Sequence, residues 1–142
     1  MKIIYKTRAT AVGGRSGRSA LDDGSLAFDL ARPGSGKPGA NPEQLFSIGY
    51  AACFDSALNL MAPRSGKRIE GSKTSVEVGL GEKPEGGYVL DIDIYVEIKG
   101  LSEQSARELV ELTHTVCPYS NATRGNVDVR LHATAIPPAQ PV

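Results

Sequence analysis

The stretch from Asn41 to Ala62 has the longest run of apolar and small residues in the chain. Between Gln44 and Ala62 its only formal charge is Asp55, and apolar or small residues fall on nearly every side of a helical wheel. This pattern predicts a buried helix rather than a half-exposed surface helix. Asn41 as the N-cap and Gln44 three positions later make a capping box at its start. The stretch is too polar for a bilayer because it is interrupted by Gln44, Ser47, Asp55, Ser56 and Asn59.

Shorter patterns predict elements on both sides of this helix. Alternating or β-branched segments predict strands over Ile3–Val12, Leu26–Leu30, Thr74–Leu80, Tyr88–Ile98 and Asn126–Ile136. The fourth of these strands alternates cleanly, which predicts one packed face and one face in water.

A second helix is predicted from its N-cap Ser102 to Cys117. It ends there because Pro118 disfavours helical geometry in the residue before it. Its apolar face consists of Ala106, Leu109, Val110 and Thr113.

The segments between these elements predict turns and loops. In the turn Gly13–Ser19 we expect the glycines to supply positive φ angles and to let another backbone come close. A second turn is predicted at Ser120–Gly125, and a Pro-rich tail follows the last strand. Gly34–Gly39 matches the spacing G-x-G-x-x-G, but prolines flank and interrupt it, so we interpret it as a chance match rather than a dinucleotide site.

The order of elements, without repeat or linker, predicts one α+β domain over residues 1–142. In this fold a mostly antiparallel sheet wraps the long central helix. Sixteen basic residues balance sixteen acidic ones, and no basic run suggests a nucleic acid partner. The N-terminal segment lacks the build of a signal peptide, so we expect a cytoplasmic protein without structural disulfides and without a membrane partner.

The chain has two cysteines, Cys53 in the central helix and Cys117 at the end of the second. In a cytoplasmic protein they are inert core thiols, metal ligands or a redox pair. Metal sites usually bring ligands in close pairs, and the one close pair is His114 with Cys117, so we expect no metal and interpret His114 as a surface histidine. Inert packing is the simplest interpretation of Cys53.

A reactive Cys53 would need a neighbour that stabilises its thiolate. Arg15 in the glycine turn and Glu43 at the helix start suit this role by type, Glu43 by holding the arginine. Glu43 and Cys53 are ten positions apart, about 15 Å along a straight helix. Either the helix is kinked near Gly49, or Glu43 and Cys53 meet across two chains. We therefore expect a two-fold homodimer with active sites at its interface.

Three blocks of the sequence closely resemble the organic hydroperoxide resistance proteins, the Ohr branch of the Ohr/OsmC superfamily. They are Gly13-Gly14-Arg15-Ser16-Gly17-Arg18, the segment from Asn41 to Phe54 that contains Gly49-Tyr50-Ala51-Ala52-Cys53-Phe54, and Val116-Cys117-Pro118-Tyr119-Ser120-Asn121-Ala122-Thr123-Arg124-Gly125. The resemblance spans Ala9 to about Ala133.

The resemblance implies a peroxidase that uses cysteine thiols and binds no cofactor or metal. Cys53 matches the peroxidatic cysteine and Cys117 the resolving cysteine, so the two are expected to form a redox-active disulfide. Arg15 matches the arginine that activates the thiolate, and Glu43 matches the carboxylate that orients it. The family forms intertwined homodimers, reduces alkyl and fatty-acid hydroperoxides to alcohols, and is re-reduced by dihydrolipoyl groups on proteins.

For such a substrate, we expect apolar walls from Phe46, Ile48 and Phe54. Two features depart from the family pattern: Ser16 replaces a common acidic residue, and Asp55–Leu60 is unusually polar. The alternatives are an OsmC-type peroxidase of broader peroxide choice and a dimeric binding domain without catalysis.

Overall fold

The computed structural model describes residues 1–137, so most of the Pro-rich tail lies outside the described residues. The chain divides into two compact units, Met1–Leu45 and Phe46–Val142, and each is described by itself. The expectation of a single domain stays a prediction. The α+β class is confirmed, with two three-stranded sheets, and every strand pair but one is antiparallel.

The first unit holds an antiparallel sheet in the order β1-β2-β3. Its strands are β1 (Ala9–Val12), β2 (Arg18–Leu21) and β3 (Ala27–Asp29). The strand predicted from Ile3 begins only at Ala9, because β2 ends at Leu21, the partner of Ala9. β2 itself was missed, since the predicted turn covered its first residues.

The glycines between β1 and β2 have the predicted roles. Gly13 and Gly14 have φ angles of 84° and 59° and lead into the short 3-10 helix η1 (Gly14–Ser16). A Cβ atom on Gly17 would lie 1.8 Å from the carbonyl oxygen of Val12, so no larger residue fits there. This tight turn fixes the backbone that carries Arg15.

Helix α1 (Pro42–Arg64) starts at the predicted capping box. The Gln44 N–H donates to Asn41 Oδ1 over 2.8 Å, and the Asn41 N–H donates to Gln44 Oε1 over 3.0 Å. The helix is uninterrupted at Gly49. The expectation that its polar residues make it too polar for a bilayer is not supported, since by length and composition alone it is apolar enough to span a membrane. The core helices of soluble proteins pass the same test.

The sequence predicted a buried helix, and within the single chain α1 is buried only in part. The sheet covers one side of the helix, and the side chains buried there are Tyr50, Phe54, Ala57, Leu58 and Ala62. On other sides, Ile48 and Leu60 remain 64% and 51% exposed. Two large apolar side chains of α1 therefore stay uncovered within this chain.

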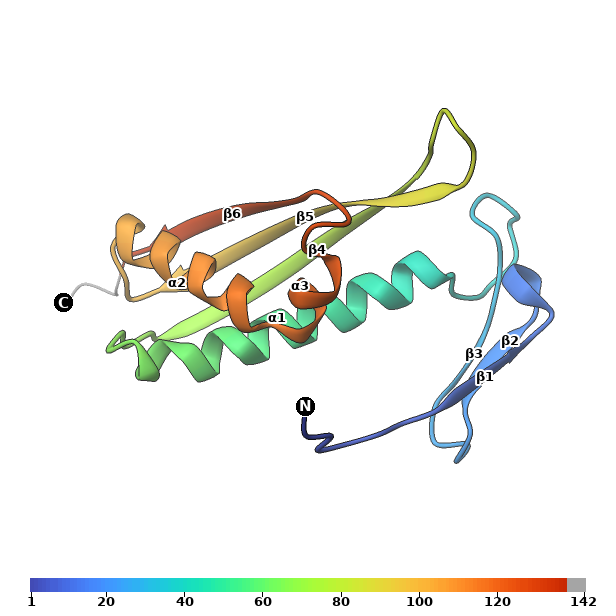
Figure 1. Cartoon of the computed structure of the whole chain (residues 1–142), viewed down its shortest axis with the longest axis horizontal. Coiled ribbons are helices and arrows are strands. Elements are labelled where there is room, and N and C mark those ends of the chain that lie inside the picture. The colour runs from blue at the N-terminus through green and yellow to red at the C-terminus, as the bar shows by residue number, and fades with distance from the viewer. Residues whose placement is uncertain (138–142) are drawn as a thin grey trace. The chain divides into compact units, whose positions relative to one another are not determined.

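The second unit is a two-layer arrangement of helices on one face of a sheet (Figure 1). Strands β4 (Gly71–Glu82) and β5 (Tyr88–Lys99) pair antiparallel, and β6 (Val129–Ile136) pairs parallel to β5. β4 and β5 extend past their predicted ends, whereas β6 starts three residues after its predicted start. The predicted alternation of β5 is confirmed, since the residues that pack against the helices are Ile92, Ile94, Val96 and Ile98.

Helix α2 (Glu103–Val116) has the predicted N-cap, the predicted buried face and the predicted C-terminal end. The Ser102 side chain accepts a hydrogen bond from the Ser105 N–H, and all four residues of the predicted apolar face are buried. The turn predicted at Ser120–Gly125 is correct only in its last two residues, because Pro118–Thr123 form the short helix α3 and the turn begins at Arg124. Pro118 occupies the first turn of α3, where a missing N–H costs nothing.

The polar segment of α1 is an anchor to β4. Asp55 Oδ1 accepts hydrogen bonds from Ser72 Oγ at 2.9 Å and Thr74 Oγ1 at 2.8 Å. Asn59 Nδ2 donates to the same Ser72 hydroxyl at 2.9 Å. The departure from the family pattern at Asp55–Leu60 therefore supplies hydrogen bonds that fix α1 against the sheet.

Candidate active site

Cys53 and Cys117 lie in contact although they are 64 residues apart in sequence. Their Sγ atoms are 3.6 Å apart, and both thiols are free. Cys117 is fully buried, whereas Cys53 on α1 is partly exposed. A disulfide bond is about 2.05 Å long, so a modest approach of the two sulfurs would join them. The structure thus brings together the two cysteines that the sequence analysis paired.

The position of Cys117 follows from the Cys-Pro sequence. Cys117 ends α2 and begins α3 with an extended backbone, φ −62° and ψ 124°. Its N–H still donates to Thr113 in α2, and its carbonyl accepts from Asn121 in α3, both at 2.9 Å. The residue is therefore held from both sides at the corner between two helices.

The groups around Cys53 shift the pKa of its thiol in opposite directions. Burial raises the pKa of Cys53 above its ordinary value, and the adjacent Cys117 thiol raises it further. The backbone N–H of Tyr119 acts in the other direction and lowers the pKa, because a hydrogen bond from it stabilises the negative thiolate. The net direction within this unit is upward, so a reactive thiolate requires an additional positive neighbour.

An aromatic cluster of Phe46, Tyr50 and Tyr119 lies beside the cysteines. The three rings approach one another with centroids 5.6–5.9 Å apart. The Tyr119 ring also covers Gly49, where an added Cβ atom would lie only 2.7 Å from the Tyr119 hydroxyl oxygen. Gly49 therefore provides room for Tyr119 rather than a break in α1.

The residues expected to line a substrate pocket lie in three different environments. Phe46 belongs to the aromatic cluster, Phe54 is a fully buried core residue, and Ile48 is 64% exposed. Their role as a substrate wall stays a prediction. A pocket of about 300 Å³ does include Phe46, together with apolar side chains of β5 and the segment after α3 and the amine-bearing Lys83.

A chain of buried hydrogen bonds next to Cys117 was missed in the sequence. His114 Nδ1 lies 2.8 Å from Ser120 Oγ, which lies 2.8 Å from the Tyr50 hydroxyl oxygen. The Tyr50 hydroxyl is also 3.3 Å from Thr123 Oγ1. His114, interpreted above as a surface residue, is half-buried, and burial followed by the nearby Arg124 lowers its pKa. The sequence signal was present, since His114 and Ser120 both lie three residues from Cys117.

Arg15 and Glu43 form a close ion pair in the first unit. Two guanidinium nitrogens of Arg15 donate to the two carboxylate oxygens of Glu43 over 2.7 and 2.6 Å. The hydrogen bond from Arg15 is the largest cause that lowers the pKa of Glu43, and the same bond raises the pKa of Arg15. The pair forms with Ser16 in the loop, so the acidic residue common in the family is not needed for it. Arg18, by contrast, makes an exposed pair with Asp29 at 3.0 Å.

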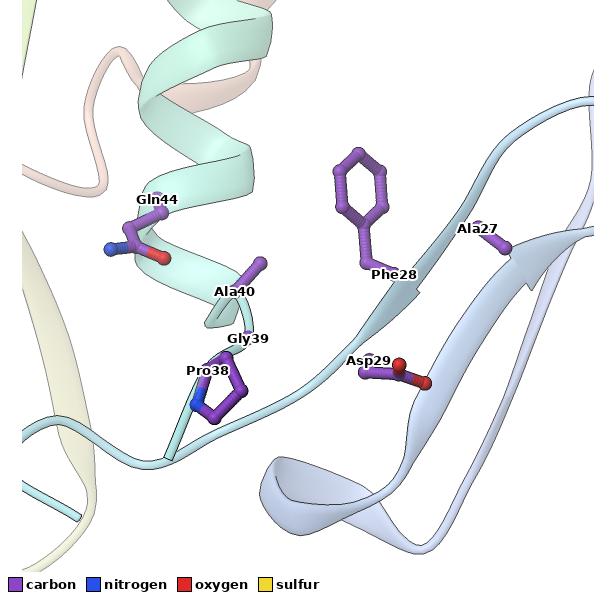
Figure 2. A pocket seen from close by; sticks show the side chains of 7 residues that line it. All are labelled: Ala27, Phe28, Asp29, Pro38, Gly39, Ala40 and Gln44. Carbon is purple, nitrogen blue, oxygen red and sulfur yellow. The ribbon is translucent and has the colours of Figure 1, made fainter. Parts of the chain in front are cut away.

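The same unit contains a pocket of about 400 Å³ at the start of α1. Figure 2 shows the Phe28 ring of β3 standing beside this opening, with Gln44 of the first helical turn across from it. The remaining lining comes from Ala27, Asp29, Pro38, Gly39 and Ala40. The described structure therefore supplies a partly apolar hollow in the unit that carries the arginine–glutamate pair.

A second charged cluster lies on the outer face of the second sheet. Arg130 bridges Asp91 and Asp93 at 2.7–2.9 Å, and His132 Nε2 lies 2.8 Å from Asp93. The hydrogen bonds from Arg130 and then His132 lower the pKa of Asp93 to about 2. These groups satisfy one another in solvent, so we interpret them as a surface ion-pair network.

The fold and the contact between the two thiols indicate a thiol protein. Comparison with known proteins shows the family to which it belongs. Residues 34–132 match the family model of OsmC-like proteins. An organic hydroperoxide resistance protein of Xanthomonas axonopodis pv. citri is 42% identical over 92% of this chain and 94% of its own length.

Solved structures give the same result. The structure of an organic hydroperoxide resistance protein from Legionella pneumophila is similar with a TM-score of 0.89 and 45% identity, over 94% of this chain and 99% of its own. One from Vibrio cholerae, with captopril bound in one of its active sites, has a TM-score of 0.87 and 40% identity over 95% and 94%. The chain belongs to the Ohr/OsmC superfamily, in the branch of the organic hydroperoxide resistance proteins.

The Arg15–Glu43 pair predicts a pH-dependent stability. Arg15 lowers the pKa of folded Glu43 below its unfolded value, so the pair stabilises the fold fully above the ordinary glutamate pKa of about 4.3. This contribution is lost as the pH falls through the lower, folded pKa. We expect Glu43→Gln to lower the urea midpoint at pH 7, and the gap from the parent protein to narrow progressively below about pH 4.

The exposed pair Arg18–Asp29 provides the control, because Asp29→Asn removes a carboxylate whose partner is in solvent. We expect this variant to change the midpoint at pH 7 much less than Glu43→Gln does. Equal losses in the two variants, or a Glu43→Gln gap that does not change with pH, would contradict the assigned pairing.

Proposed function

We propose that this protein is a cysteine-based peroxidase that reduces organic hydroperoxides to alcohols. The observation that carries the proposal is the 3.6 Å approach of the two free thiols, Cys53 and Cys117. The names of the relatives support the substrate class, since they are described as organic hydroperoxide resistance proteins. If both thiols were inert core residues, both would be expected to be buried, whereas Cys53 is partly exposed.

The first chemical step is the attack of the Cys53 thiolate on the distal oxygen of the peroxide. The O–O bond breaks, the alkoxide takes a proton and leaves as an alcohol, and Cys53 becomes a sulfenic acid. Cys53 is partly exposed and accessible to a peroxide, whereas Cys117 is buried, which supports the peroxidatic role proposed for Cys53. The Tyr119 N–H supports the reactive thiolate from the protein side.

In the second step Cys117 attacks the sulfenic acid sulfur of Cys53. A disulfide forms and the hydroxyl leaves as water, so the two electrons taken by the peroxide come from the two thiols. The short distance makes this step fast and protects Cys53 from irreversible oxidation. A dithiol then reduces the disulfide by exchange and is itself oxidised. We propose dihydrolipoyl groups on proteins as this reductant, with no bound cofactor and a cytoplasmic setting.

Arg15 is the proposed source of the positive charge that Cys53 lacks within its own unit. The carboxylate of Glu43 holds both ends of the guanidinium, which fixes its orientation toward a substrate or thiolate. Ten residues of uninterrupted helix separate Glu43 from Cys53, about 15 Å of rise. This favours the second alternative above, in which Arg15 and Glu43 of one chain serve Cys53 of another.

A homodimer also accounts for apolar surface that the single chain leaves uncovered. In α1 the exposed apolar residues include Ile48 and Leu60. At the N-terminus, Ile3, Ile4 and Tyr5 are 54–89% exposed. Surfaces of this kind usually mark an interface, and two-fold symmetry would pair the same helix from each chain.

Single-cysteine variants test the catalytic assignment. We expect Cys53→Ser to abolish hydroperoxide consumption, because it removes the nucleophile. We expect Cys117→Ser to consume one equivalent of peroxide per chain and then stop at a sulfenic acid, which dimedone labels at Cys53 in a mass spectrum. Continued turnover by Cys53→Ser would refute the mechanism, and a wild-type protein without any turnover would favour the non-catalytic binding domain. Equal efficiency with hydrogen peroxide would favour the OsmC-type alternative.

The dimer is tested by a charge placed at Ile48, an exposed apolar residue of α1. We expect Ile48→Glu to convert the dimer to a monomer in light scattering, because a buried unpaired carboxylate opposes association. Ile136→Glu is the matched control, since Ile136 is 40% exposed at the end of β6, where register and alternation place it on the outer face of the sheet. If both variants leave the mass unchanged, or if the parent protein is a monomer, the interface assignment is wrong.

A further inference from the structure

The buried polar chain beside the cysteines connects three helices at one point. His114 comes from the last turn of α2, Tyr50 from α1, and Ser120 and Thr123 from α3. Tyr50 and Ser120 are fully buried, and Thr123 is 5% exposed. Burying several polar groups is unfavourable unless each finds a hydrogen-bond partner. Apolar side chains would fill the same space without this requirement, so these polar groups indicate a role beyond packing.

One arrangement of protons satisfies every contact in the chain. The His114 Nδ1–H donates to Ser120 Oγ at 2.8 Å, and the Ser120 hydroxyl donates to the Tyr50 oxygen at 2.8 Å. The Tyr50 hydroxyl donates to Thr123 Oγ1 at 3.3 Å, and the Thr123 hydroxyl donates to the Ser120 carbonyl at 3.2 Å. Ser120 is the centre of this chain, because it contacts the other three residues.

The chain holds the turn that faces Cys53. Ser120 follows Tyr119, which stands in the first turn of α3 two residues after Cys117, whose Sγ lies 3.6 Å from that of Cys53. From this position the backbone N–H of Tyr119 lowers the pKa of Cys53. The Tyr119 side chain is 38% exposed and is held mainly by ring contacts, so it constrains its own backbone only in part. The backbone of Tyr119 is thus fixed between Cys117, at the corner of two helices, and Ser120, at the centre of the buried chain.

We propose that Ser120 is a positioning residue that, with His114 and Tyr50, keeps the Tyr119 N–H directed at the Cys53 sulfur. Its effect on the reaction passes through that N–H, and it touches no reacting atom. Only the expected effect of Ser120 on peroxide turnover rests on the proposed function. The position of the N–H can be tested on the thiol itself, whether or not the protein reduces a peroxide.

The test is the pH dependence of Cys53 alkylation by iodoacetamide in the full-length protein, followed for the Cys53 peptide by mass spectrometry. Removing Ser120 Oγ by Ser120→Ala should raise the midpoint by about one pH unit, because the thiolate loses a donor. Oxidation by an alkyl hydroperoxide near neutral pH should slow about tenfold and recover at high pH, as one unit changes the thiolate fraction tenfold.

Two variants of His114 provide a second test, in which one should shift the alkylation midpoint and the other should restore it. His114→Leu should shift the midpoint in the same direction, and it carries the test if Ser120→Ala does not fold. His114→Asn should restore the parent midpoint, because the asparagine amide can donate from near the position of Nδ1.

Thr113→Val is the matched control, one residue away. Its hydroxyl is buried but bonds to the Leu109 carbonyl of its own helix at 2.7 Å. We expect a lower melting temperature for this variant without a change in the alkylation midpoint.

Two results would overturn the proposal. One is a folded Ser120→Ala or His114→Leu protein that melts earlier but alkylates Cys53 with the parent midpoint, which would make the buried chain purely structural. The other is a midpoint shift in Thr113→Val as large as in Ser120→Ala. A parent protein that leaves hydroperoxide untouched refutes the proposed function instead, and the alkylation midpoints still decide the role of Ser120.

Discussion

The close approach of the segment after α2 to helix α1 is the constraint on which the thiol site depends. Gly49 leaves room for the Tyr119 ring, and without that room Tyr119 would have to move away from α1. The same approach brings the Tyr119 N–H to Cys53 and holds Cys117 3.6 Å from it. One missing side chain therefore permits the contact between two cysteines that are distant in sequence.

The polar contacts around the site divide into two groups with different tasks. Asp55 and the buried chain at Ser120 fix α1, β4, α2 and α3 relative to one another through hydrogen bonds. Arg15 and Glu43 instead keep one charged group oriented and partly exposed. A rigid thiol pair and an oriented guanidinium are what a fast, self-protecting thiol oxidation needs, and the dimer is the proposed means of joining them.

The sequence predicted those features that depend on neighbouring residues. The cap at Asn41, the alternation of β5 and the buried face of α2 all follow from local patterns, and all are confirmed. Helix α3, the parallel pairing of β6 with β5 and the strand β2 were missed, because long-range packing decides them. The burial of α1 was overestimated, since a pattern without a polar face does not say whether the cover comes from the same chain.

The candidate site shows the same division. Residue types suggested Cys53, Cys117, Arg15 and Glu43, and resemblance to a family gave each of them a role. Composition and spacing alone left inert thiols as an alternative. The contact between the sulfurs and the bidentate ion pair appear only in three dimensions. His114 was interpreted as a surface residue and Ser120 as part of a turn. Their spacing of three residues on either side of Cys117 was visible in the sequence, but their burial depends on helix α3, which was not predicted.

The central claim is that Cys53 and Cys117 act together on a hydroperoxide. The most direct measurement mixes the fully reduced protein with a slight excess of an alkyl hydroperoxide and determines the mass and the free thiols of each chain. The account predicts a loss of two hydrogens per chain, mapped to a Cys53–Cys117 disulfide, with the peroxide consumed. Survival of both thiols while the peroxide persists would contradict it and leave a binding domain with inert core cysteines.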